Sequence, residues 1–150
     1  MIYATEMRIA GFRDAFEARH MTPAADAIEC CGYNAAAAKR VLSIRYEKLG
    51  RLPAGLLMNS ITAFEGVVQF TSTLSPDAWK TAVVGCFDWD PFAANLPFDV
   101  TMLRQDVQAI ISEAFKLAEN YDPTDQSLIL VPTVLGKKFE EAEQTKEFDR

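Results

Sequence analysis

Side chains that commonly perform catalysis or bind metals are scarce in this chain. Its 150 residues include three cysteines, Cys30, Cys31 and Cys86, and a single histidine, His20. The cysteines form no C-x-x-C pair, and one histidine leaves too few soft ligands for a zinc site of ordinary spacing. We therefore expect free thiols in the reducing cytoplasm, and neither a metal nor another cofactor.

Oxygen ligands and nucleophiles add little to this inventory. Three aspartates near one tryptophan could bind Mg²⁺, but solvated carboxylates in a turn are the better explanation. They are Asp88, Asp90 and Asp99. Ser43 and Ser75 lack a histidine at a recognisable spacing, and the glycines form neither G-x-G-x-x-G nor a phosphate loop. We predict that the chain is not an enzyme.

Length and composition indicate one ordinary globular domain. Apolar residues make up 49% of the chain and charged residues 24%, and a domain of this size buries roughly 70% of its unfolded surface. The longest uncharged stretch, residues 52–64, is short and interrupted by proline and glycine, so we expect no membrane span. We predict a single domain over residues 1–136 and a charged tail over 137–150.

Charge is distributed unevenly between the two halves of the sequence. The formal net charge is −6, with +2 in residues 1–60 and −8 in residues 61–150. The first half carries the one local concentration of basic side chains, where a single glutamate opposes five cations. These cations are Lys39, Arg40, Arg45, Lys48 and Arg51. Any contact with nucleic acid would therefore be expected here, since the acidic half would repel it.

Helix signals dominate the first third of the chain. Apolar periodicity predicts a helix over Thr5–His20. Thr22 followed by proline predicts a second, short helix over Thr22–Cys31 that stops at Gly32. Asn34 can cap a third helix that runs to about Leu49, with Gly50 as its stop signal. The last two helices would form a helix-corner-helix.

The second half predicts a small sheet and a long helix. Strands are expected over Phe64–Thr73, Trp79–Phe87, Leu96–Met102 and Leu128–Leu135, with a short helix at Leu56–Met58. Ser75 to Asp77 could instead open a helix, and Asp88 to Pro91 must be a turn or loop. The clearest helix runs from about Leu103 to Asn120. The predicted fold class is α+β, with a helical N-terminal half, a small antiparallel sheet and a long amphipathic C-terminal helix.

Residues 21–52 resemble a non-catalytic helical module that precedes the nuclease domain in some HNH endonucleases related to modification-dependent restriction enzymes. The features shared with this family are a Gly-Tyr corner at Gly32 and a Tyr-x-x-Leu-Gly ending at Tyr46 to Gly50, flanked by basic residues. A weaker match covers residues 97–115, around Leu103 to Val107. The resemblance implies a winged-helix-like module without nuclease activity, associated with DNA or with a DNA-acting nuclease.

Two binding functions and a simpler explanation follow from these patterns. A helix in a DNA groove needs a capped N-terminus, polar side chains and flanking cations, for which the candidates are Asn34, Lys39, Arg40, Ser43, Lys48 and Arg51. Alternatively, the acidic chain could be a small protein-binding inhibitor of the immunity, antitoxin or anti-defence type. Its apolar contact would be made by Ala37, Val41 and Ile44. The simpler explanation is that these charges only solvate a helix face.

Overall fold

The computed structural model describes residues 3–121 and 128–136, so the predicted tail over 137–150 lies outside the described residues. The elements in chain order are α1 Tyr3–Glu17, α2 Ala35–Leu49, β1 Gly55–Met58, α3 Ile61–Thr71, the 3-10 helix η1 Pro76–Trp79, β2 Val83–Phe87, the 3-10 helix η2 Pro91–Asn95, β3 Val100–Arg104, α4 Val107–Glu119 and β4 Val134–Gly136. This combination of helices with one sheet fits the predicted α+β class in its broad sense, while the parallel strands β1, β2 and β3 are the arrangement typical of α/β folds. Within the described residues, no helix is long and apolar enough to cross a membrane.

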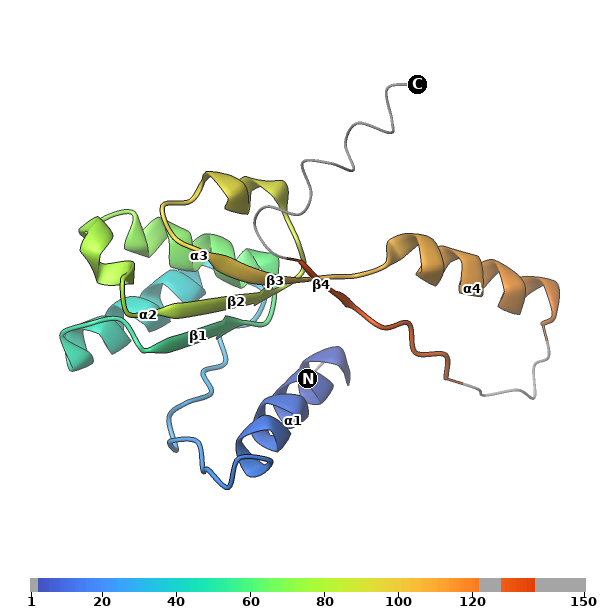
Figure 1. The fold of residues 1–150 in the computed structure, drawn as a ribbon, viewed down its shortest axis with the longest axis horizontal. Helices are drawn as coiled ribbons and strands as arrows, with labels where there is room; N and C mark the ends of the chain where they lie inside the picture. Colours follow the sequence, from blue (N-terminus) through green and yellow to red (C-terminus); the bar gives the residue numbers. More distant parts are fainter. Residues whose placement is uncertain (1–2, 122–127, 137–150) are drawn as a thin grey trace.

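The sheet is mixed rather than antiparallel. Its strand order is β1-β2-β3-β4, with β1, β2 and β3 parallel and β4 antiparallel to β3. The predicted antiparallel sheet is therefore wrong for the first three strands. The reason is that α3 carries the chain back from the end of β1 to the start of β2, so that the second strand runs in the same direction. Figure 1 shows α2 and α3 together on one side of this sheet.

The hydrophobic core lies between the sheet and α3. Met58, Cys86 and Met102 are in register across three strands, so their side chains share one face, and all three are buried. Phe64 of α3 is fully buried against this layer. On its other side α3 packs against α2, and Gly66 lies at that contact. A Cβ atom on Gly66 would lie 2.1 Å from the main-chain oxygen of Ala35, so the two helices approach each other closely.

The structure confirms one of the two helices predicted for the helix-corner-helix. The α2 helix begins after Asn34, whose side chain accepts a hydrogen bond from the Ala37 main-chain NH, and it ends at Gly50 in the left-handed conformation. The short helix predicted over Thr22–Cys31 is wrong, because this segment contains only a turn near Ala27. The segment is held instead by side chains of α2, described below. The helix-corner-helix is therefore absent from this part of the described chain.

The segment predicted as a strand over Phe64–Thr73 belongs to α3. Its N-cap is Ser60, which accepts a hydrogen bond from the Ala63 main-chain NH. The helix is buried on two sides, by the sheet and by α2, so it is rich in the apolar and β-branched residues that a strand also favours. Burial on both sides leaves α3 only a narrow polar face, with Glu65 and Gln69 exposed, whereas an amphipathic helix is recognised from a broad one.

The remaining differences concern short elements. The short helix predicted at Leu56–Met58 is strand β1, and so few residues do not let periodicity distinguish a helix from a strand. The alternative helix start at Ser75 is confirmed as the cap of η1, so the predicted strand begins later, at β2. The long amphipathic helix is confirmed as α4.

Candidate functional site

Polar side chains follow all three parallel strands where those strands end. Asn59 comes directly after β1, Asp88 directly after β2 and Gln105 directly after β3. Because the strands are parallel, these residues share the carboxyl edge of the sheet. Loops at this edge form the usual binding crevice of open α/β folds. The carboxyl edge is therefore the candidate functional site.

A fourth polar side chain reaches this edge from α1. The Arg8 Nη1 atom donates hydrogen bonds to the main-chain oxygen of Asn59, at 2.6 Å, and to its Oδ1 atom, at 3.4 Å. The Asn59 amide in turn donates to Thr5 Oγ1 at 3.2 Å. The guanidinium of Arg8 also lies over the ring of Phe87, 4.5 Å from its centroid. These contacts join α1 to the ends of β1 and β2.

Asp88 is the carboxylate at the centre of this cluster. Its Oδ1 atom accepts a 2.6 Å hydrogen bond from Gln105 Nε2 and lies 3.9 Å from Arg8 Nη2. Its backbone has a φ of 73°, in the left-handed region that residues other than glycine rarely adopt. Strained conformations of this kind concentrate at functional sites, where surrounding contacts hold them in place.

The other aspartates near this edge cap helices or lie away from the cluster. Asp90 accepts a hydrogen bond from the Phe92 main-chain NH and caps η2, while Asp106 accepts one from the Ala109 NH and caps α4. Asp99 precedes β3 and so lies toward the opposite edge of the sheet. Residues 3–121 and 128–136 contain no group of three side chains that could hold a metal ion. Of the three aspartates Asp88, Asp90 and Asp99, Asp88 is therefore the one best placed to contact a ligand.

An open hollow of about 530 Å³ lies beside the cluster. Its lining combines charged, amide and aromatic side chains from the ends of β2 and β3 and from the start of α4. The lining residues are Asp88, Trp89, Arg104, Gln105, Asp106, Val107 and Gln108. Most of these side chains are charged or amide groups, with Trp89 as the aromatic member, so the hollow offers hydrogen-bonding groups beside one apolar surface.

The residues predicted from sequence lie elsewhere, on α2 and at its ends. Asn34 is used as the N-cap, and Ser43 Oγ donates to the main-chain oxygen of Arg40. Lys48 pairs with Asp26 at 3.3 Å. The other predicted cations, Lys39, Arg40 and Arg51, have exposed side chains on the same helix or just after it. None of these six residues lines the hollow.

The three residues predicted to contact a protein partner do not form one open patch. Ile44 is 58% exposed, whereas Ala37 and Val41 are half-buried. These side chains also lie on α2, away from the lining of the hollow.

Comparison with known proteins identifies the fold. No protein-family model and no curated protein matches the sequence. Among solved structures, the Cra transcriptional dual regulator from Pseudomonas putida, in complex with fructose 1-phosphate, is 20% identical, with a TM-score of 0.63 over 71% of this chain and 40% of that one. The periplasmic binding protein of the arabinose ABC transporter from Shewanella sp. ANA-3, bound to α- and β-L-arabinofuranose, is 14% identical, with a TM-score of 0.65 over 95% and 49%.

A LacI family transcriptional regulator from Lactobacillus casei is also similar. Its structure with bound Tris is 20% identical, with a TM-score of 0.60 over 89% of this chain and 51% of that one. This chain therefore spans about half or less of the length of the three proteins. The shared feature is an α/β fold that recurs in regulators and in a periplasmic binding protein.

These similarities overturn the resemblance to the HNH-associated module. A winged-helix-like module requires the helix-corner-helix, whereas here α2 packs beside α3 in an α/β fold shared with LacI-type and periplasmic binding proteins. The DNA-associated or nuclease-associated function predicted from that resemblance is therefore wrong. The alternative of a small acidic protein-binding inhibitor is not retained either, because the same comparisons relate the fold to regulators and periplasmic binding proteins.

Sequence reasoning missed Arg8, Asn59, Asp88 and Gln105. The available signal was a polar residue directly after each short apolar run, which is typical of a parallel sheet with its site at the carboxyl edge. Because the sequence of α3 predicts a strand, the β-α-β pattern that indicates a parallel sheet cannot be recognised from it.

Proposed function

We propose that this chain forms part of a binding site for a small polyhydroxylated molecule, a sugar or sugar derivative, and binds it without transforming it. The observation that carries the proposal is the convergence of Arg8, Asn59, Asp88 and Gln105 at the carboxyl edge of the sheet. The four side chains come from α1 and from the ends of three strands, and two of them, Asp88 and Gln105, also line the hollow.

The chemistry of these groups suits hydroxyl groups. A carboxylate accepts hydrogen bonds from two neighbouring hydroxyls, while guanidinium and amide groups donate to hydroxyl oxygens. Trp89 in the lining of the hollow offers an aromatic surface against which the C–H groups of a sugar ring can pack. Donors, acceptors and an apolar wall are thus present together, as a polyol requires.

The fold comparisons support the same ligand class. The proteins with similar structures are described with fructose 1-phosphate, with L-arabinofuranose and, in a second structure of the Lactobacillus casei regulator at a TM-score of 0.56, with sucrose. Sugar binding in those proteins is a reason to test sugars here. We also retain the cytoplasm as the proposed compartment, because the three cysteines are free thiols.

The test is a titration of the purified protein with fructose 1-phosphate, sucrose and L-arabinose. Isothermal calorimetry would measure affinity, and tryptophan fluorescence would report on the site because Trp89 lines the hollow. We expect at least one of the three to bind, and Asp88→Ala to weaken that binding by about tenfold or more. The matched control is Asp77→Ala, which removes an exposed aspartate from η1.

The expected result for the control is an unchanged affinity, because Asp77 pairs with Lys80 at the surface rather than with the site. The proposal is wrong if none of the three compounds binds at concentrations of about 10 mM. It is also wrong if Asp77→Ala weakens binding as much as Asp88→Ala does.

A further inference from the structure

The α1 helix brings Arg8 to the site but has little packing of its own. None of its residues 3–17 is buried. An open hollow of about 540 Å³ lies between α1 and the segment that follows it, lined from α1 by Glu6, Ile9 and Arg13 and from the segment by Pro23, Ala24, Ala25, Ile28 and Cys30. Figure 1 shows α1 set apart from the layer of α2 and α3. Helices without buried apolar contacts are at the low end of local stability.

The contacts that join α1 to the sheet edge are mainly polar. Arg8 and Thr5 bond to Asn59, Arg8 lies near Asp88, and Thr5 Oγ1 lies 3.5 Å from the Tyr33 hydroxyl. Each of these contacts is at the N-terminal half of α1. The position of Arg8 therefore also depends on what holds the other end of the helix, which continues into the connecting segment 18–34.

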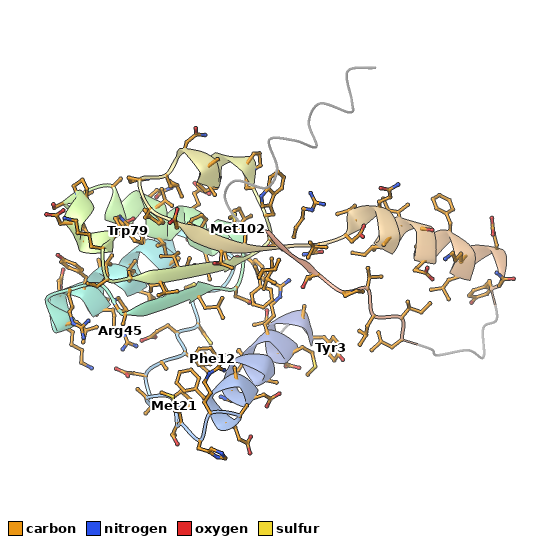
Figure 2. All side chains as sticks on the ribbon, in the orientation of Figure 1. Tyr3, Phe12, Met21, Arg45, Trp79 and Met102 are labelled. Atoms are coloured by element: carbon orange, nitrogen blue, oxygen red, sulfur yellow. The ribbon has the colours of Figure 1, made fainter. Side chains whose placement is uncertain are left out.

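The connecting segment is tied to α2 by Arg45. Its Nη1 atom lies 3.0 Å from Asp26 Oδ2 and its Nη2 atom 3.3 Å from Glu29 Oε1, and the guanidinium also donates to the main-chain oxygen of Asp26. The Arg45 side chain is 18% exposed, less than either carboxylate. A hydrogen bond from Lys48 and the charge of Arg45 lower the pKa of Asp26. Figure 2 labels Arg45 on α2, Phe12 on α1 and Met21 on the connecting segment.

We propose that Arg45 is a positioning residue: through Asp26 and Glu29 it holds the connecting segment so that α1 presents Arg8 to the candidate site. The α1 helix is then a flap, held by the polar contacts of its N-terminal half and, through the connecting segment, by Arg45, and its position is stabilised further when a ligand contacts Arg8. This inference rests on the proposed function for its ligand, but the mechanical connection between Arg45 and α1 can be measured without one.

The first experiment measures amide hydrogen exchange of α1 in the absence of ligand. Partly exposed ion pairs contribute little individually, so we expect Arg45→Gln to accelerate exchange of the α1 amides by about threefold. Exchange in α3 should not change. The matched control is Arg40→Gln, which removes an exposed arginine from the same helix. The double variant Asp26→Asn, Glu29→Gln removes both ion pairs from the other side, leaves the main-chain contact of Asp26, and should reproduce most of the effect.

The second experiment measures affinity for whichever sugar binds in the titration above. Arg45→Gln should weaken it by about threefold, Arg45→Lys should restore part of the loss, and saturating sugar should slow α1 exchange in the unmodified chain. Unchanged α1 exchange in both Arg45→Gln and the double variant overturns the proposal. So does α1 exchange as slow as that of α3 in the unmodified chain. If exchange responds but no sugar binds, the proposed function fails while the role of Arg45 stands.

Discussion

Arg8 Nη1 donates a 2.6 Å hydrogen bond to the main-chain oxygen of Asn59, a residue 51 positions away in the sequence. This contact places the first helix at the end of the first strand. Through the same guanidinium the helix also reaches Phe87 and Asp88 at the end of the second strand. The site is therefore assembled from segments that are distant along the chain.

Replacing Arg8 should weaken ligand binding more than it affects stability. Arg8→Met removes the donors to Asn59 and the charge near Asp88, so we expect a loss of affinity of about tenfold. The free energy of unfolding should fall by about 1 kcal/mol or less, because the contacts are only part-buried and water can replace the lost donors. Calorimetry and urea unfolding measure the two quantities. Arg13→Met, an exposed arginine on the same helix, should change neither, and an equal loss of affinity in that control would contradict the assignment.

Adding a methyl group at the contact between α2 and α3 should destabilise the fold. In Gly66→Ala the new Cβ would lie 2.1 Å from the Ala35 oxygen and 2.9 Å from the Ala38 Cβ atom. The two helices must move apart, at a cost of about 3 kcal/mol in the free energy of unfolding. The control is Gly11→Ala in α1, where nothing lies within 4 Å.

That control should stabilise α1 by about 0.5 kcal/mol, because alanine is a better helix former than glycine. Urea midpoints of the two variants provide the measurement. A Gly66→Ala protein as stable as the unmodified chain would show that α2 and α3 are less closely packed than described.

The three cysteines should differ in reactivity. Burial, and to a lesser degree the charge of Asp88, raise the pKa of Cys86 to about 12, and burial also raises the pKa of Cys31. Cys30 is exposed. At pH 8 a thiol reagent should therefore label Cys30 first, Cys31 more slowly and Cys86 only after unfolding, which mass spectrometry can resolve. Labelling of Cys86 as fast as Cys30 in the folded protein would refute the burial of β2.

The raised pKa of Cys86 also predicts how stability changes with pH. Below about pH 8.5 the thiol is protonated in both the folded and the unfolded chain, so the group has no effect there. As the pH rises toward 12, the unfolded chain releases this proton while the folded chain retains it, and the free energy of unfolding falls. Urea unfolding at pH 7 and pH 10 should show this fall in the unmodified chain and a smaller one in Cys86→Ala. Equal falls in both proteins would argue against it.

Substitutions on α4 should affect surface properties more than stability. Ile111 and Phe115 are 51% and 67% exposed, and no residue of α4, residues 107–119, is buried. Replacing both with glutamate should reduce binding of a hydrophobic dye and change the free energy of unfolding by less than about 1 kcal/mol. Phe64→Ala is the contrasting change, with an expected cost of about 4 kcal/mol. A similar cost for the α4 double variant would mean that α4 is packed in solution.

Local signals in the sequence are sufficient to predict those elements whose boundaries depend on neighbouring residues. Asn34 and Gly50 defined the start and the end of α2, because caps satisfy the free main-chain groups at helix ends. The α4 helix was predicted from its apolar stripe, since it has an exposed polar face to contrast with it. The loop after Asp88 followed from Pro91, which restricts the residue before it.

Only the tertiary structure decided the parallel strands, the identity of α3 and the site. The polar face of α3 is narrow, with Glu65 and Gln69 exposed, because the helix is buried on two sides, and its apolar, β-branched sequence resembles that of a buried strand. The α3 helix returns the chain to the edge of the sheet at which β1 begins, so β2 runs parallel to β1. Asn59 and Asp88, which follow these two strands, therefore lie at the same end of the sheet. Strand direction is set by crossover connections and not by neighbouring residues, so the convergence of Arg8 with these two residues exists only in the folded chain.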